Sequence, residues 1–273
     1  MKPVRTLVHD AHISHLVVHS TKKIVRSFQD NVQLGTLLAF VAGSVNSVAF
    51  VQFGTYVSHV SGHATRAAID YAQGDLTSAF LFLMEFLCFI LGAAATAFLL
   101  KGETAASVRI KYTVPIFLEL GLILLFMVGV LLHRNRPFEG HYFSHLTFLL
   151  AIAMGMQNAM LRQASGTLIR TTHMTGVATD FGVEVGTALR HGGGVFWTSE
   201  RNVLMAMYEG LRAFMSRLGV SRFLFHGFII LSFSSGAVVG TLGFLMAESY
   251  VLLIPICTLL VVGIQEYRRN PQK

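Results

Sequence analysis

The chain has 273 residues, of which 53% are hydrophobic and only 13% are charged, and its formal net charge is +7. A water-soluble domain usually carries about 25% charged residues, so this composition excludes an ordinary soluble protein and indicates an integral membrane protein. The Lys and Arg residues are spread through the segments between apolar runs, a distribution that argues against nucleic-acid binding.

The first 33 residues form a basic tail without the short apolar core or the cleavage site of a signal peptide. The following apolar run is therefore predicted to be a permanent anchor. The tail alternates aliphatic residues with His9, His12, His15 and His19. We interpret it as a cytoplasmic amphipathic helix on an anionic membrane surface, in preference to a metal store.

Six apolar runs are long enough to cross a bilayer core of roughly 30 Å as helices. They are 34–53, 76–100, 113–133, 143–161, 222–246 and 249–267. The sequence therefore predicts an all-α polytopic membrane protein with six transmembrane helices. Both cysteines, Cys88 and Cys257, fall inside predicted spans, so a disulfide framework is not expected.

The distribution of positive charge predicts the orientation. If the N-terminus is cytoplasmic, the outer segments contain only three of the 21 Lys and Arg residues, namely Arg66, Arg134 and Arg136. Cytoplasmic segments of membrane proteins carry an excess of Lys and Arg. Both termini are therefore expected to be cytoplasmic, including the tail 268–273.

A polar phrase occurs twice in this apolar chain. SHVSGHATRAAID occupies 58–70, and THMTGVATDFGVE occupies 172–184. Upstream, Gly43 and Asn46 match Gly155 and Asn158 at a constant offset of 112 residues. Downstream, GAAAT at 92–96 matches GAVVG at 236–240, and these small residues are expected to let helices of the two halves pack closely.

The repeat divides the chain into two units of three spans, 34–133 and 143–267, joined by an external connector at 134–142. The second unit includes a cytoplasmic amphipathic segment at 190–221. An odd number of spans per unit turns the second copy upside down, as in many secondary transporters. Chance similarity between apolar segments is the alternative.

Each phrase is predicted to break the backbone after the first span of its unit. Ser61 or Thr175 would cap a new helix, and Gly62 or Gly176 would permit the turn. A short helix would then run to Asp70 or Glu184. Broken backbone at membrane depth often lines a substrate site, although two interfacial loops that only start the next helix would look the same.

Two carboxylates, Glu85 and Glu119, lie within predicted spans. A charged side chain at the centre of a span costs about 2.5–3.5 kcal/mol on insertion scales, so such residues are commonly functional. Either could take up and release a proton, or pair with a cation. The alternative is a structural hydrogen bond to Asn46, Gln157, Asn158 or a threonine hydroxyl.

Histidines gather on the predicted outer face. His59 and His63 are four residues apart, as are His141 and His145, so each pair would share one side of a helix. With Asp70 or Asp75 as a third ligand, His59 and His63 could bind zinc or a similar divalent ion. Ordinary polar surface is the alternative.

Motifs for enzymatic chemistry are absent from the sequence. HGGG at 191–194 is similar to an esterase oxyanion hole, but the chain contains no G-x-S-x-G nucleophile motif. It also lacks a P-loop, a dinucleotide fingerprint and H-E-x-x-H. The sequence therefore predicts no enzyme and no cofactor.

The second half carries MGMQNAMLRQASGTLIRTTHMTG at 154–176. This stretch resembles the YoaK-like (UPF0700) family of uncharacterised bacterial membrane proteins. The resemblance extends from Leu34 to Gly263, and it implies a six-span fold in the bacterial inner membrane without an established activity. The first half departs from the family, which usually has Asp at the position of Asn46 and Thr-Gly-Asn at 61–63.

These observations together predict a small secondary permease or exchanger for a small polar or ionic solute, embedded in the lipid bilayer and able to form a homo-oligomer. A non-transporting membrane scaffold or sensor, and an enzyme acting on lipid-soluble substrates, are the alternatives. The predicted coupling residues are Glu85 and Glu119. The predicted solute-binding residues, where the two broken segments would meet, are Asn46, Ser61, Gly62, Thr65, Asn158, Thr175, Gly176 and Thr179.

Overall fold

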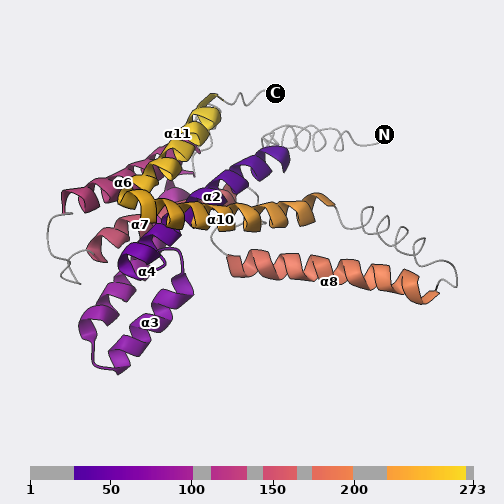
Figure 1. The fold of residues 1–273 in the computed structure, drawn as a ribbon, viewed down its shortest axis with the longest axis horizontal. Coiled ribbons are helices and arrows are strands. Elements are labelled where there is room, and N and C mark those ends of the chain that lie inside the picture. Colours follow the sequence, from indigo (N-terminus) through magenta and orange to yellow (C-terminus); the bar gives the residue numbers. More distant parts are fainter. Residues whose placement is uncertain (1–27, 101–111, 134–143, 165–173, 199–219, 269–273) are drawn as a thin grey trace, which may run out of the picture.

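The computed structural model describes residues 28–100, 112–133, 144–164, 174–198 and 220–268. Every regular element in these ranges is a helix, which confirms the prediction of an all-α protein (Figure 1). The elements are α2 (Phe28–Phe53), α3 (Val60–Ala72), α4 (Leu76–Leu99), α6 (Thr113–Leu132), α7 (Ser144–Ala164), α8 (Met174–Thr198), α10 (Val220–Ala247), η1 (Glu248–Leu252) and α11 (Leu253–Arg268).

Four segments of the described chain are long and apolar enough to cross a membrane: Asp30–Phe53, Leu76–Leu99, Thr113–Leu132 and Phe223–Arg268. The last has 46 residues and contains the predicted spans 222–246 and 249–267, separated by η1. The remaining predicted span, 143–161, corresponds to α7. This helix is not among the four, because Gln157 and Asn158 lower its hydropathy, yet its central residues are buried in the bundle.

The break after α2 lies earlier in the chain than the sequence indicated. Gly54 has a φ of +73° and its N–H donates to the carbonyl of Phe50, so this glycine ends α2. Ser61 and Gly62 lie inside the first turn of α3, where neither caps nor breaks a helix. The predicted roles of Ser61 and Gly62 in the break were therefore wrong.

The second phrase is also more helical than predicted. α8 begins at Met174, so Thr175 and Gly176 belong to its first turn, and the helix continues past Glu184 to Thr198. The residues that precede it, 165–173, and most of the predicted amphipathic segment, 199–219, lie outside the described residues. The basic N-terminal tail up to residue 27 lies outside them as well.

Two helix crossings bring backbones into direct contact. At the α2–α10 crossing, a Cβ added to Gly43 would overlap the carbonyl oxygen of Phe233, and one added to Gly236 would overlap that of Phe40. At the α4–α7 crossing, Gly92 and Gly155 leave the same room for the carbonyls of Ile152 and Phe89. The predicted close packing at GAAAT and GAVVG is thus confirmed, because only glycine fits at these points.

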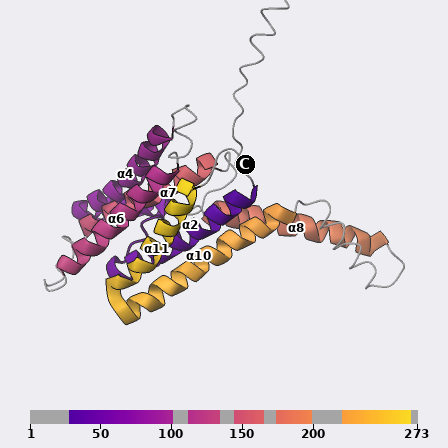
Figure 2. The same ribbon diagram turned by 90° about the horizontal axis from the view of Figure 1, so that it is seen from above.

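Buried side chains of α2, α6, α7 and α11 form the main core, with Leu38, Phe126, Met154 and Leu259 fully enclosed. α3 and α8 lie outside this core. Among the described helices, the backbone contacts of α3 are with α4 and those of α8 are with α10, and Val177 of α8 also belongs to a small buried cluster with Ala39 of α2. Figures 1 and 2 show α8 extending along α10 away from α4, α6 and α7, while α3 lies beside α4.

Candidate functional site

A buried carboxylate, Glu85, is the centre of the candidate site. α4 begins after Asp75, whose side chain accepts a hydrogen bond from the N–H of Ser78. Glu85 follows about 14 Å along the helix at 1.5 Å per residue, within the span Leu76–Leu99, and it is 3% exposed. A carboxylate in this position requires hydrogen-bond donors or a counter-charge.

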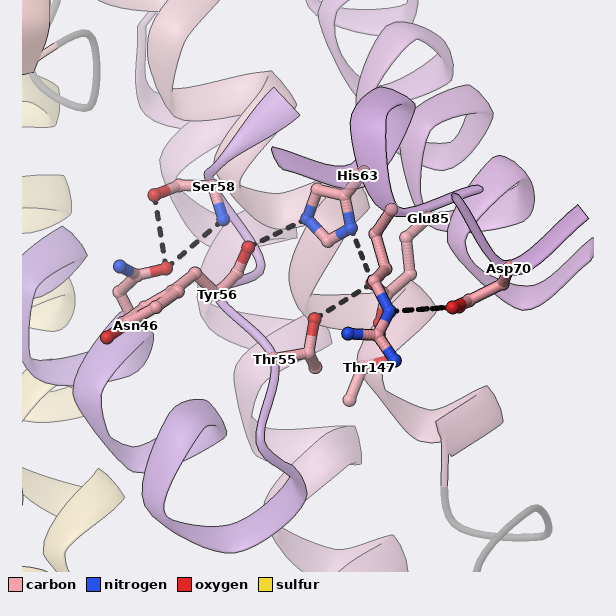
Figure 3. Close-up of polar contacts among 9 residues, drawn as sticks. Asn46, Thr55, Tyr56, Ser58, His63, Asp70, Glu85 and Thr147 are labelled. Carbon is pink, nitrogen blue, oxygen red and sulfur yellow. Dashed lines mark hydrogen bonds and ion pairs between the residues drawn. The ribbon is translucent and has the colours of Figure 1, made fainter. Parts of the chain in front are cut away.

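Three segments supply the partners of Glu85 (Figure 3). The Thr55 hydroxyl, from the α2–α3 connection, donates to Oε2 over 3.0 Å. The Thr147 hydroxyl, from α7, donates to Oε1. Nδ1 of His63, from α3, lies 2.7 Å from Oε2, and the side chains of both His63 and Glu85 are 4% exposed. One carboxylate thus joins α3, α4, α7 and the chain after α2.

The contacts of His63 indicate that its Nε2 atom carries a hydrogen. Its Nε2 is 2.7 Å from the carbonyl oxygen of Tyr56, and a carbonyl can only accept, so Nε2 carries a hydrogen. Nδ1 and the Glu85 oxygen, at 2.7 Å, would repel each other without a proton between them. Nδ1 has no hydrogen bond of regular geometry, so this is a close buried contact that becomes an ion pair when His63 carries a second proton.

Asn46 holds the segment that supplies two of these partners. Its Oδ1 accepts from the Ser58 N–H at 3.2 Å and from the Ser58 hydroxyl at 3.1 Å. The Tyr56 ring stacks on Phe50 of α2 with centroids 4.2 Å apart. These contacts fix the 54–59 connection against α2. Asn46, one of the predicted solute-binding residues, thereby positions Thr55 and the Tyr56 carbonyl.

A permanent ion pair lies next to this centre on α3. Nε of Arg66 is 2.9 Å from Asp70 Oδ1 and 3.0 Å from Oδ2, and Asp70 is buried. The Arg66 guanidinium also lies over the Phe82 ring of α4, 5.9 Å from its centroid. The negative charge of Asp70 is thereby balanced by Arg66 of the same helix, which also contacts α4.

The other predicted solute-binding residues do not converge. Ser61, Thr65, Thr175 and Thr179 are exposed, and the hydroxyls of Thr65 and Thr179 donate to carbonyls of their own helices, those of Ser61 and Thr175. Gly62, Gly176 and Asn158 are half-buried on α3, α8 and α7. α3 and α8 make no contact with each other. The expected meeting of the two phrases is therefore not present among the described residues, because each helix packs on the second span of its own half.

Glu119, the second predicted coupling residue, lies in α6 and is fully buried. Neither of its carboxylate oxygens has a hydrogen-bond partner among the described residues. It is absent from the contacts that surround Glu85, so the two carboxylates occupy separate environments.

The metal prediction gains no support. Within the described ranges, no group of three His, Cys, Asp or Glu side chains could hold a metal ion. His59 is exposed, and both ring nitrogens of His63 face Glu85 and Tyr56 instead. His141 lies outside the described residues, and His145 is exposed. Zinc binding by His59 and His63 stays a prediction.

Sequence reasoning selected Glu85 and His63 but did not connect them, and it missed Thr55 and Thr147. Thr55 had a detectable signal, because Gly54-Thr55 recurs as Gly166-Thr167 in the repeat. Thr147 had none, since a single threonine in an apolar run is common and its partner lies 62 residues earlier.

The profile of the family described as "Protein of unknown function (DUF1275)" matches residues 34–265. The chain belongs to the DUF1275 family. A UPF0700 transmembrane protein of Rhizobium meliloti (strain 1021) is 26% identical over 174 residues, which cover 63% of this chain and 69% of the relative. No solved structure matches the chain.

Membership in DUF1275 confirms the resemblance to the UPF0700 proteins that the sequence indicated. Together with the apolar spans, it identifies a multi-pass membrane protein that is embedded in the lipid bilayer.

Proposed function

We propose that this protein is a small secondary permease or exchanger for a small polar or ionic solute, and not an enzyme, in which Glu85 couples solute movement to proton movement. The observation that carries the proposal is the buried His63–Glu85 pair, in which Nδ1 and Oε2 lie 2.7 Å apart and Glu85 belongs to a candidate membrane span. Ionisable groups at this depth mark proton or ion pathways in many transporters.

The charge of the pair changes with each proton that it gains or loses. From an imidazolium–carboxylate pair, a proton gained by Glu85 gives a neutral acid beside an imidazolium, and loss of the proton on Nδ1 leaves two acceptor atoms facing each other across 2.7 Å. Either change weakens the contact that holds α3 to α4. Because α3 packs on no other described helix, the proton state of Glu85 would decide how firmly α3 covers the site.

The pattern of helix contacts supports an inverted repeat. α2 packs on α10 as α7 packs on α4, α3 packs on α4 as α8 packs on α10, and α6 packs on α7 as α11 packs on α2. A pseudo-two-fold axis that relates 34–133 to 143–267 would produce these reciprocal pairs. In our proposal the two symmetry-related halves move against each other, so that the solute site opens alternately to the two sides of the membrane.

We further propose six crossings, by α2, α4, α6, α7, α10 and α11, in the bacterial inner membrane with both termini cytoplasmic. The 46-residue run Phe223–Arg268 would be about 69 Å long as one helix, roughly twice the hydrocarbon core, and η1 interrupts it. Two crossings are the natural arrangement. The solute would bind near the matched residues Asn46 and Asn158, half-buried on α2 and α7.

The test is solute-dependent proton movement in proteoliposomes that contain a trapped pH-sensitive dye. We expect a panel of small ions, amino acids and sugars to include a solute that changes the internal pH with the wild-type protein. Glu85→Gln should abolish this response, because an amide cannot exchange a proton. Glu248→Gln, which removes an exposed carboxylate at the start of η1, should retain it.

Equal proton movement in wild type and Glu85→Gln would contradict the coupling role of Glu85. If no solute of the panel moves protons or raises the thermal stability of the purified protein, the scaffold or sensor alternative is favoured. The hydroxyls of Thr65 and Thr179, which bond within their own helices, are compatible with that alternative.

A further inference from the structure

We propose that Glu184 of α8 and His226 of α10 form a second proton-binding site, which fastens α8 to α10 when His226 is protonated. Nδ1 of His226 lies 3.1 Å from Oε2 of Glu184, and the two side chains are 12% and 17% exposed. A protonated imidazole makes a charge-assisted hydrogen bond to a carboxylate, roughly twice as strong as the bond from a neutral ring.

Among the described side chains, this pair makes the polar contact between α8 and α10, and its neighbours are apolar. One turn before it along each helix, the rings of Phe181 and Phe223 stack with centroids 4.8 Å apart. Val177 is buried in a small core with Phe225 and Ile229 of α10 and Ala39 of α2. The backbone contacts of α8 with the other described helices are those with α10, so the strength of the Glu184–His226 bond would affect how firmly α8 is held.

The matching position in the first half shows why this contact should respond to pH. Glu184 corresponds to Asp70, since each lies five residues after the last Thr of its phrase. Asp70 is held by Arg66, which is charged at every physiological pH. The residue that corresponds to Arg66 is Asp180, so the second half lacks this permanent cation.

In the second half, the group that can pair with Glu184 is His226, and it lies on α10 and not on α8 itself. The alignment of Gly92 with Gly236 places His226 where the first half has Phe82, the ring beneath Arg66. An imidazole ordinarily titrates near pH 6.5, about the middle of the physiological range. The second half thus replaces a permanent ion pair by one that depends on a bound proton.

The charged groups around His226 are acidic among the side chains that the structure describes. α8 contributes Glu184 and, one turn earlier, the exposed Asp180. α2, which packs on the other side of α10, has Asp30 as its charged residue, and Asp30 lies beside Gln265 and Glu266 of α11. A proton on His226 therefore adds positive charge beside the Glu184 carboxylate, while the side chain of Arg222, one turn earlier in α10, lies outside the described side chains.

The two proton sites would face opposite sides of the membrane. Glu85 precedes the crossing glycine of α4, Gly92, and His226 precedes that of α10, Gly236. In an inverted repeat α4 and α10 run in opposite directions, so the N-terminal sides of the two crossings lie at opposite faces. Proton binding at the Glu184–His226 pair does not depend on whether the protein transports a solute. Its place in a carrier cycle rests on the proposed function.

The experiment measures the α8–α10 separation with spin labels by pulsed electron resonance at about pH 5.5 and about pH 8.5, on either side of the usual histidine titration. Labels are placed on cysteines at Gly186, where an added Cβ meets nothing within 4 Å, and at Leu231, which is 66% exposed. Cys88 and Cys257 are first replaced by alanine. We expect one narrow distance distribution at the lower pH and a broader or longer one at the higher pH.

Three variants make the test specific. His226→Phe restores the ring of the matching position, Glu184→Gln keeps the size of the side chain, and both should remove the pH dependence. Glu85→Gln should leave it intact, so a failure of the coupling proposal does not affect this result. A pH-independent distance in the wild-type protein, or a pH dependence that persists in both Glu184→Gln and His226→Phe, would overturn the second site.

Discussion

At the scale of single residues, the structure accounts for how a carboxylate is tolerated inside a membrane span. Each oxygen of Glu85 has its own hydroxyl donor, Thr55 for Oε2 and Thr147 for Oε1, and Nδ1 of His63 lies 2.7 Å from Oε2. A buried acceptor that loses its donor costs about 1–3 kcal/mol. The two threonines are therefore as much a part of the site as the ionisable pair.

We predict that Thr147→Val lowers the free energy of unfolding by about 1–3 kcal/mol, because Oε1 of Glu85 loses its donor. In a Glu85→Leu background the same change should cost much less, since no carboxylate remains. Thermal unfolding of the purified variants measures both effects. Thr258→Val is the control, because its hydroxyl bonds to Ile254 in its own helix, and an equal loss in the control would contradict the prediction.

At the scale of helices, the glycines decide which spans pack together. Gly43 and Gly236 let α2 and α10 meet at backbone distance, and Gly92 and Gly155 do the same for α4 and α7. Hydroxyls reinforce both crossings, since Ser44 donates to the Gly236 carbonyl and Thr96 to that of Met156. Helices in lipid associate through close packing and such hydrogen bonds.

We predict that Gly43→Ala and Gly92→Ala each destabilise the protein by about 1–3 kcal/mol, as overpacking does elsewhere, because the new methyl would overlap a carbonyl oxygen. Gly121→Ala in α6 is the matched control. Its Cβ would meet nothing within 4 Å, and alanine favours a helix over glycine by up to about 1 kcal/mol. If all three variants unfold at the same temperature, the crossings are not the close contacts described here.

At the scale of the whole molecule, the outer surface fits a lipid environment. Large apolar side chains stay exposed along the spans, among them Phe98, Leu132, Leu245 and Met246. A soluble monomer rarely exposes so much apolar surface, whereas lipid chains cover it at no cost. The buried polar contacts gather instead at Glu85 and at the helix crossings.

The proposed topology predicts that 134–142 and α8 lie on opposite sides of the membrane. Cysteine at Gly140 should react with a membrane-impermeant maleimide on intact cells, and cysteine at Gly193 should react only after permeabilisation. The variants are made without Cys88 and Cys257. Labelling of both positions from the same side would contradict the inverted repeat, and with it the opposite orientation of the two proton sites.

The sequence alone determined the class of protein and much of its organisation. Low charge content and long apolar runs require a helical membrane protein, because a spanning helix satisfies its own backbone hydrogen bonds in lipid. The choice of Glu85 and of the glycine motifs also followed from the sequence, since a charge or a small residue within a span is conspicuous by itself. Each of these features can be recognised within a single helix, without knowing which other helices it contacts.

Only the tertiary structure decided which groups meet. His63 reaches Glu85 from α3, and Thr147 reaches it from α7, because helix rotation and register at the α3–α4 and α4–α7 contacts bring their side chains together. The same packing keeps α3 and α8 apart, although their sequences are nearly a repeat. Gly54 and Gly62 are the same residue type eight positions apart, but of these two only Gly54 takes a positive φ. Contacts between helices depend on how whole surfaces interlock, and no local pattern encodes that information.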